Sequence, residues 1–167
     1  MYIDALSFLE DEREAWTPYE ALGELPDDAL EHAMPADGPT HGWRGRDLVA
    51  HVVGWQQVAL GIARELAIGG TSATLDRVNA DWDTRGPDAI NTGMLAEWAA
   101  LPLDEVRHRL ATVAGELRGY LTVVPETRWV KRPATMSFLL ECTLDHYAEH
   151  TPELEAVVGG VGVARGG

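Results

Sequence analysis

Apolar residues recur every three or four positions along most of the chain, a period that is typical of amphipathic α-helices. The clearest stripe lies within residues 45–68 and is followed by two glycines, which favour a helix end. Its members are Leu48, Val52, Trp55, Ala59, Ile62 and Leu66. Alternating, strand-like sequence is confined to the short segments 121–124 and 129–130. The pattern therefore predicts an all-α fold.

Proline and glycine divide the apolar pattern into four long helical stretches. We expect these stretches at about residues 3–22, 45–68, 87–121 and 134–158. Pro18 and Pro152 lack an amide N–H, so we expect the first stretch to kink and the last to kink or restart at Thr151. The third stretch is expected to break near residues 101–102. Residues 71–86 are polar and are expected to form an irregular crossover connection, so the pattern predicts a four-helix bundle.

The length of 167 residues suits one domain. We expect the bundle to span residues 1–158. Residues 159–167 include five glycines and are expected to form a flexible tail.

The charge and hydropathy of the chain restrict its partners. There are 13 basic and 27 acidic residues, so the formal net charge is −14, which argues against nucleic acid and anionic membranes as partners. No apolar run reaches the ~18 residues of a membrane span. The first residues lack the basic and apolar regions of a secretory signal. A cytoplasmic protein is the resulting expectation.

Two histidines spaced four apart, His146 and His150, are the sharpest chemical feature. On a helix they share one face, one turn apart, and can chelate one divalent ion. His51 lies on the apolar face of the 45–68 stretch, where a lone histidine is more often a packed core residue. If the second and fourth helices are neighbours, the three histidines form a metal site with open positions for water or substrate.

Other residues near the three histidines are candidates for further roles. Cys142 is the single cysteine, and the eight residues from it to His150 cover about 12 Å of helix rise, so we expect it to pack near the site without being a ligand. Glu149 is a candidate general base if it points into the pocket. Trp55 and Tyr147 are candidate substrate-binding residues, with core packing as the alternative for Trp55. The other histidines, at positions 32, 41 and 108, are expected at the surface.

Two segments resemble the motifs of the DinB-like, or YfiT-like, superfamily of metal-binding proteins. Residues 43–55 are similar to its pattern Trp-x-x-x-Asp-Leu-x-x-His-x-x-x-Trp, and residues 145–154 to its His-x-x-x-His near the C-terminal helix. With the middle segment, the likeness covers most of residues 3–158. The chain is most similar to the ClbS/DfsB-type four-helix bundles, and it resembles the metal-binding domain of mycothiol-dependent maleylpyruvate isomerases.

The resemblance implies an up-down-down-up bundle with a long crossover between its second and third helices. It also implies a zinc or nickel ion at the positions of His51, His146 and His150, and a homodimer. Members of the superfamily include thiol S-transferases, a thiol-dependent isomerase and small-molecule resistance proteins.

We therefore expect a metal-dependent enzyme acting on a small molecule. It would be a transferase or isomerase that uses a low-molecular-weight thiol as cosubstrate, or a hydrolase. The alternatives are a non-catalytic small-molecule binding or resistance/stress protein and a purely structural bundle.

Overall fold

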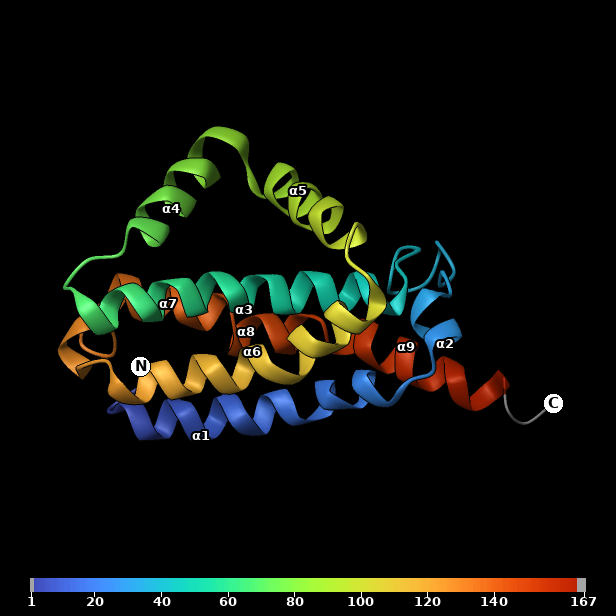
Figure 1. Ribbon diagram of the computed structural model, residues 1–167, viewed down its shortest axis with the longest axis horizontal. Helices are drawn as coiled ribbons and strands as arrows, with labels where there is room; N and C mark the ends of the chain where they lie inside the picture. Colours follow the sequence, from blue (N-terminus) through green and yellow to red (C-terminus); the bar gives the residue numbers. More distant parts are fainter. Residues whose placement is uncertain (1, 165–167) are drawn as a thin grey trace.

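The computed structural model describes residues 2–164, and over this range the chain is all-helical without a β-strand (Figure 1). A single isolated β-bridge joins Ala33 and Arg44. The predicted helical class is confirmed. The strand-like segment 121–124 lies at the end of a helix, and residues 129–130 are turns between helices.

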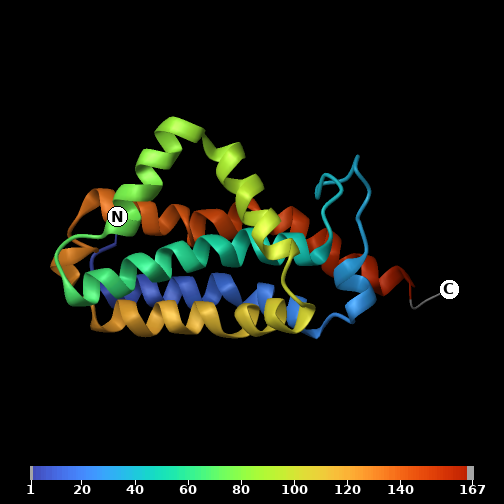
Figure 2. The ribbon, with the colours of Figure 1, turned by 45° about the horizontal axis from the view of Figure 1, so that its top comes forward.

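Four lengthwise helical elements form the body of the molecule, and a two-helix hairpin rises from it (Figures 1 and 2). The body contains α1 (Ala5–Trp16), α3 (Gly45–Ile68), α6 (Leu103–Val123) and the series α7 (Pro133–Glu141), α8 (Leu144–Glu149) and α9 (Thr151–Ala164). The hairpin consists of α4 (Ala73–Arg85) and α5 (Pro87–Ala99). Short elements complete the chain: the 3₁₀ helices η1 (Thr17–Glu24) and η2 (Glu126–Arg128), and α2 (Asp27–Glu31).

Helix α3 has the bounds that its apolar stripe predicts. Its start is capped by Asp47, whose carboxylate accepts a hydrogen bond from the Arg44 backbone N–H at 2.9 Å. It packs along α6 and also contacts both helices of the hairpin. Because it is covered on several sides, α3 buries polar His51 and Gln56 together with its apolar residues.

The expectation of an irregular connection at residues 71–86 is wrong, because most of it forms helix α4. The Ser72 side chain caps this helix by accepting a hydrogen bond from the Leu75 backbone N–H at 3.1 Å. Glu65 of α3 accepts hydrogen bonds from the Ser72 hydroxyl at 2.5 Å and from the Thr74 backbone N–H at 3.0 Å. Only Val78 of α4 is buried, so the helix lacks the apolar stripe that would have revealed it.

The last helical stretch is divided twice. Helix α9 begins at Thr151, as Pro152 predicts. An additional break at Cys142–Thr143 separates α7 from α8, and there the Thr143 hydroxyl donates to the Leu139 carbonyl at 2.6 Å. Helix α9 continues to Ala164 where the sequence predicts a flexible tail from residue 159; residues 165–167 of that expected tail lie outside the described residues.

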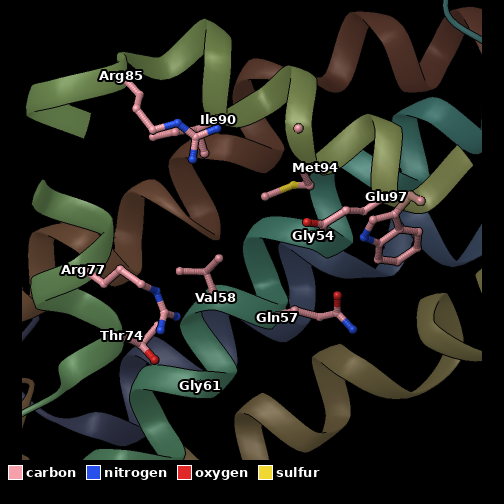
Figure 3. Close-up of a pocket in the computed structure, with 12 residues that line it drawn as sticks. Gly54, Gln57, Val58, Gly61, Thr74, Arg77, Arg85, Ile90, Met94 and Glu97 are labelled. Carbon is pink, nitrogen blue, oxygen red and sulfur yellow. The ribbon is translucent and has the colours of Figure 1, made fainter. Parts of the chain in front are cut away.

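The hairpin packs closely on α3 at Gly54. A Cβ atom at this position would lie 2.2 Å from the Met94 Sδ and 2.8 Å from its Cγ, so glycine permits the close approach of the Met94 side chain of α5 (Figure 3). Within residues 2–164, no helix is long and apolar enough to cross a membrane.

We predict opposite effects of the same substitution at two helical glycines. Gly54→Ala should cost roughly 1–3 kcal/mol through overpacking against Met94, less the gain in helix propensity. Gly115→Ala should raise stability by about 0.5–1 kcal/mol, because a Cβ there meets no atom within 4 Å. Urea denaturation measures both, and adding Met94→Ala should relieve part of the Gly54→Ala defect. Equal effects at the two sites would contradict the close approach.

Candidate metal centre

Three histidines from distant parts of the chain converge on one point. His51 lies on α3, His146 on α8 and His150 at the junction of α8 and α9. One ring nitrogen from each lies within 4.8 Å of the others. The Nε2 atoms of His51 and His146 are 2.9 Å apart, and each pair of ring centroids is separated by 4.7 Å. These separations fit ligands that each lie ~2.0–2.1 Å from a shared zinc ion.

The donor set suits a divalent ion. His51 is 6% exposed, His146 is 7% exposed, and the His150 side chain is 12% exposed. The Nδ1 atoms of all three rings are buried without a hydrogen-bond partner among the described residues. His51 and His146 converge through their Nε2 atoms, so these two rings present Nε2 to a shared ion.

Burial keeps two of the rings neutral. Desolvation, with a contribution from His150, lowers the pKa of His51 to about 4. Desolvation and the neighbouring rings of His51 and His150 lower the pKa of His146 to about 3. At neutral pH both imidazoles therefore offer a lone pair to a cation without competition from a bound proton.

The carboxylate of Glu153 lies next to the His150 ring. Glu153 Oε1 lies 3.3 Å from His150 Nδ1, although the pair is not aligned as a hydrogen bond. The other oxygen of Glu153, Oε2, is buried and has no partner among the described residues. Carboxylates at this position orient histidine ligands and raise their basicity.

The orientation of α8 follows from Tyr147, which points away from the histidines. Its hydroxyl donates to Glu12 Oε1 at 2.8 Å and accepts from Gln56 Nε2 at 2.7 Å. Its carbonyl accepts from the Tyr19 hydroxyl at 2.6 Å. Tyr147 is 1% exposed and does not line the cavity beside the histidines, so its position does not support the expected substrate-binding role.

The histidines form part of the wall of a cavity of about 650 Å³. This volume is in the range of small-molecule sites. Trp55 lines the cavity and, at 6% exposure, also packs in the core; its indole N–H donates to Asn91 Oδ1 at 3.0 Å. Glu149 also lines it, at an exposed position, so its side chain is within reach of a ligand there.

Cys142 lines the same cavity and is 2% exposed. Burial raises the pKa of its thiol well above the ordinary value, so the thiol stays protonated at neutral pH. It does not belong to the group of converging donor atoms. Its position agrees with the expectation of a packed residue near the site.

Several cavity residues were missed by the sequence analysis. The ring of Trp43 lies 5.1 Å from that of His51 and 6.1 Å from that of His150. Trp43 precedes α3 within the segment that resembles the superfamily motif, which was the available signal. Trp82, on α4, was missed because its segment was predicted to be irregular. His41 was expected at the surface; it is exposed and also lines the cavity.

A second cavity of about 390 Å³ lies between α3 and the hairpin (Figure 3). Its charged lining residues are Arg77, Arg85 and Glu97. It contains no histidine or cysteine, so it offers fewer groups for metal binding or nucleophilic chemistry than the histidine cavity.

Comparison with known proteins found no match. No family model matches the chain, and the comparisons with curated proteins and with solved structures gave no match either. The resemblance to the DinB-like superfamily therefore stays a prediction from the motifs.

We predict that the metal-free chain loses stability as the pH falls from about 6.5 to about 4. The unfolded chain takes up protons on His51 and His146 in this window, whereas the folded chain excludes them. Each excluded proton contributes a slope of up to about 1.4 kcal/mol per pH unit. Urea denaturation at several pH values, with a chelator present, measures this slope.

Matched variants distinguish the contribution of His51 and His146 to this slope from that of the carboxylates, whose ordinary pKa values lie near the same pH window. His51→Gln/His146→Gln should make the slope shallower, because the folded and unfolded chains then differ by fewer protons. His108→Gln changes an exposed ring and should leave the slope as in the original chain. An unchanged slope in the double variant would contradict the lowered pKa values.

We predict that Tyr147→Phe destabilises the chain by about 1–3 kcal/mol, because Glu12 and Gln56 each lose a buried hydrogen-bond partner. It should also weaken metal binding, since the hydroxyl holds α8 in place. Tyr120→Phe makes the same chemical change at a residue that is 38% exposed and should stay within about 0.5 kcal/mol. Thermal denaturation and metal titration check both variants, and equal stability of the two would contradict the anchoring role.

Proposed function

We propose that the chain is a divalent-metal-dependent enzyme that acts on a small molecule. The observation that carries the proposal is the convergence of three largely buried histidines in the wall of a 650 Å³ cavity. His51, His146 and His150 would hold zinc or nickel. Because three protein ligands leave a tetrahedral ion one open position, the site has the composition of a catalytic centre and differs from a closed structural one.

A bound ion would supply Lewis acidity, which lowers the pKa of a thiol or of water at its open position. The first case leads to a thiol-dependent transferase or isomerase, and the second to a hydrolase. The thiol would come from a cosubstrate, because the Cys142 thiol is buried and its pKa is raised. Glu149, exposed on the cavity wall, is our candidate for moving a proton to or from the substrate.

We further propose that the body is an up-down-down-up four-helix bundle. In Figure 1, α1 and the α7–α9 series run toward the end of the molecule near α2, whereas α3 and α6 run the other way. The hairpin α4–α5 would then be the crossover between the second and third bundle helices. This topology supports the resemblance to the DinB-like superfamily, in which homodimers are common.

The alternative is a non-catalytic binding or resistance protein with the same site. The specific observation that favours it is the state of the one cysteine at the cavity: Cys142 is 2% exposed and burial raises the pKa of its thiol, so it is not a ready nucleophile. Such a protein would bind its ligand and release it unchanged.

We predict that the chain binds one zinc or nickel ion with the three histidines. His51→Ala, His146→Ala or His150→Ala should each lower the affinity at least tenfold, because a ligand is lost. His108→Ala removes an exposed histidine and should leave binding unchanged. Isothermal titration with metal-free protein, and elemental analysis of the purified chain, measure stoichiometry and affinity. Failure of the original chain to bind a divalent ion would overturn the proposal.

Turnover by the loaded chain separates the enzyme from the binding protein. A neutral thiol such as 2-mercaptoethanol with 1-chloro-2,4-dinitrobenzene probes the transfer reaction, and a nitrophenyl ester probes hydrolysis. The enzyme should accelerate one of these reactions only when metal is bound, and His51→Ala should lose the acceleration. A ligand that raises the melting temperature without product formation would favour the alternative.

A further inference from the structure

We infer that the cavity beside the three histidines accepts a small organic cation: an amine or quaternary ammonium group carried on an apolar body. The inference rests on the proposed function in that it concerns the same cavity, and it names the substrate class. It is carried by the charge of the cavity wall, by its aromatic rings and by the buried polar side chains along it.

The charged wall residues are acidic. Four carboxylates line the cavity, those of Glu141, Asp145, Glu149 and Glu153, and no lysine or arginine is among its lining residues. Within the described part of the chain, none of the four lies within ion-pair distance of an arginine or lysine. With neutral histidines, a bound divalent ion would offset only two of these negative charges, so the loaded cavity still favours a cation.

Three tryptophans supply faces for such a cation. Trp43, Trp55 and Trp82 line the cavity from the segment before α3, from α3 and from α4. The rings of Trp55 and Trp82 lie 6.0 Å apart at an interplanar angle of 65°, so they form a corner. Indole is the aromatic ring that attracts cations best, and several such rings beside carboxylates are the chemistry that recognises ammonium groups.

The wall of the cavity also contains buried polar side chains. Glu153 Oε2 is buried and unpaired among the described residues, and so are the Nδ1 atoms of His51 and His146. Both of these histidines are more than nine-tenths buried and line the cavity. The three tryptophans and these buried side chains are independent of the exposed carboxylates, so the site does not rest on surface charge alone.

The test compares three probes of similar shape and different charge. Benzyltrimethylammonium is the cation, benzyl alcohol is neutral, and phenylmethanesulfonate is the anion. The quaternary ammonium has no lone pair and cannot coordinate a metal, so its binding reports the cavity wall. Tryptophan fluorescence and isothermal titration, on metal-free and zinc-loaded protein, should show the cation binding at least tenfold more tightly than the anion, with a smaller ratio at high salt.

Isosteric variants test which residues cause the preference for the cation. Asp145→Asn/Glu149→Gln removes two exposed cavity carboxylates and should weaken binding of the cation about fivefold, with little change for benzyl alcohol. Glu10→Gln/Glu155→Gln makes the same change in net charge at exposed positions outside the cavity and should leave binding unchanged. Trp82→Leu should weaken binding of the cation through loss of an aromatic face.

The outcomes separate this inference from the proposed function. Equal or tighter binding of the sulfonate, or an equal loss in the two double variants, would overturn the inference even if the metal binds as proposed. A cation preference in a chain that binds no divalent ion would support the inference and overturn the proposed function. Metal content is therefore measured on every sample.

Discussion

The arrangement of the body depends on one buried carboxylate. Glu12 is 0% exposed, and a buried charge is costly unless it is paired and hydrogen-bonded. Its oxygens accept from the Tyr147 hydroxyl at 2.8 Å and from Arg118 at 2.7 Å, and Gln56 donates to the same tyrosine. These four residues come from α1, α8, α6 and α3, so the hydrogen bonds around the carboxylate join all four lengthwise elements, α3 through Tyr147. A partly satisfied network of this kind is less stable than an apolar core, which makes it a strict constraint.

The same constraint positions the histidines. Tyr147 follows His146 directly, and adjacent side chains on a helix point in directions about 100° apart. When the tyrosine is fixed toward Glu12, His146 therefore faces a different side of α8, where it meets His51. The break at Cys142–Thr143 ends α7 before α8 begins. The restart at Thr151 places His150 at the junction of α8 and α9. His146 and His150 thus lie one turn apart, and His51 approaches them from α3.

The sequence predicted those helices that bury a periodic stripe of apolar residues. It also predicted the two histidines that lie close together along the chain. The bounds of α3 followed from its stripe, and His146 and His150 followed from their separation of four. Helix α4 was missed because it buries only Val78 and is stabilised by polar caps at Ser72 and Glu65. The direction of Tyr147 could not be predicted, because it depends on Glu12, which is 135 residues away in the chain. Pairings over such distances are set by tertiary packing and leave no local signal.

The hairpin α4–α5 both packs on α3 and contributes a side chain to the wall of the cavity. The Met94 side chain of α5 packs against α3 where Gly54 has no side chain, and α4 contributes Trp82 to the cavity while most of its residues stay exposed. An element that buries so little apolar surface adds little to global stability and opens at a lower free energy than the body. The three histidines lie on the four lengthwise elements, whereas Trp82 of the cavity wall lies on the hairpin. Metal affinity should therefore follow the register set by Glu12, and ligand affinity should follow the packing of the hairpin at Gly54.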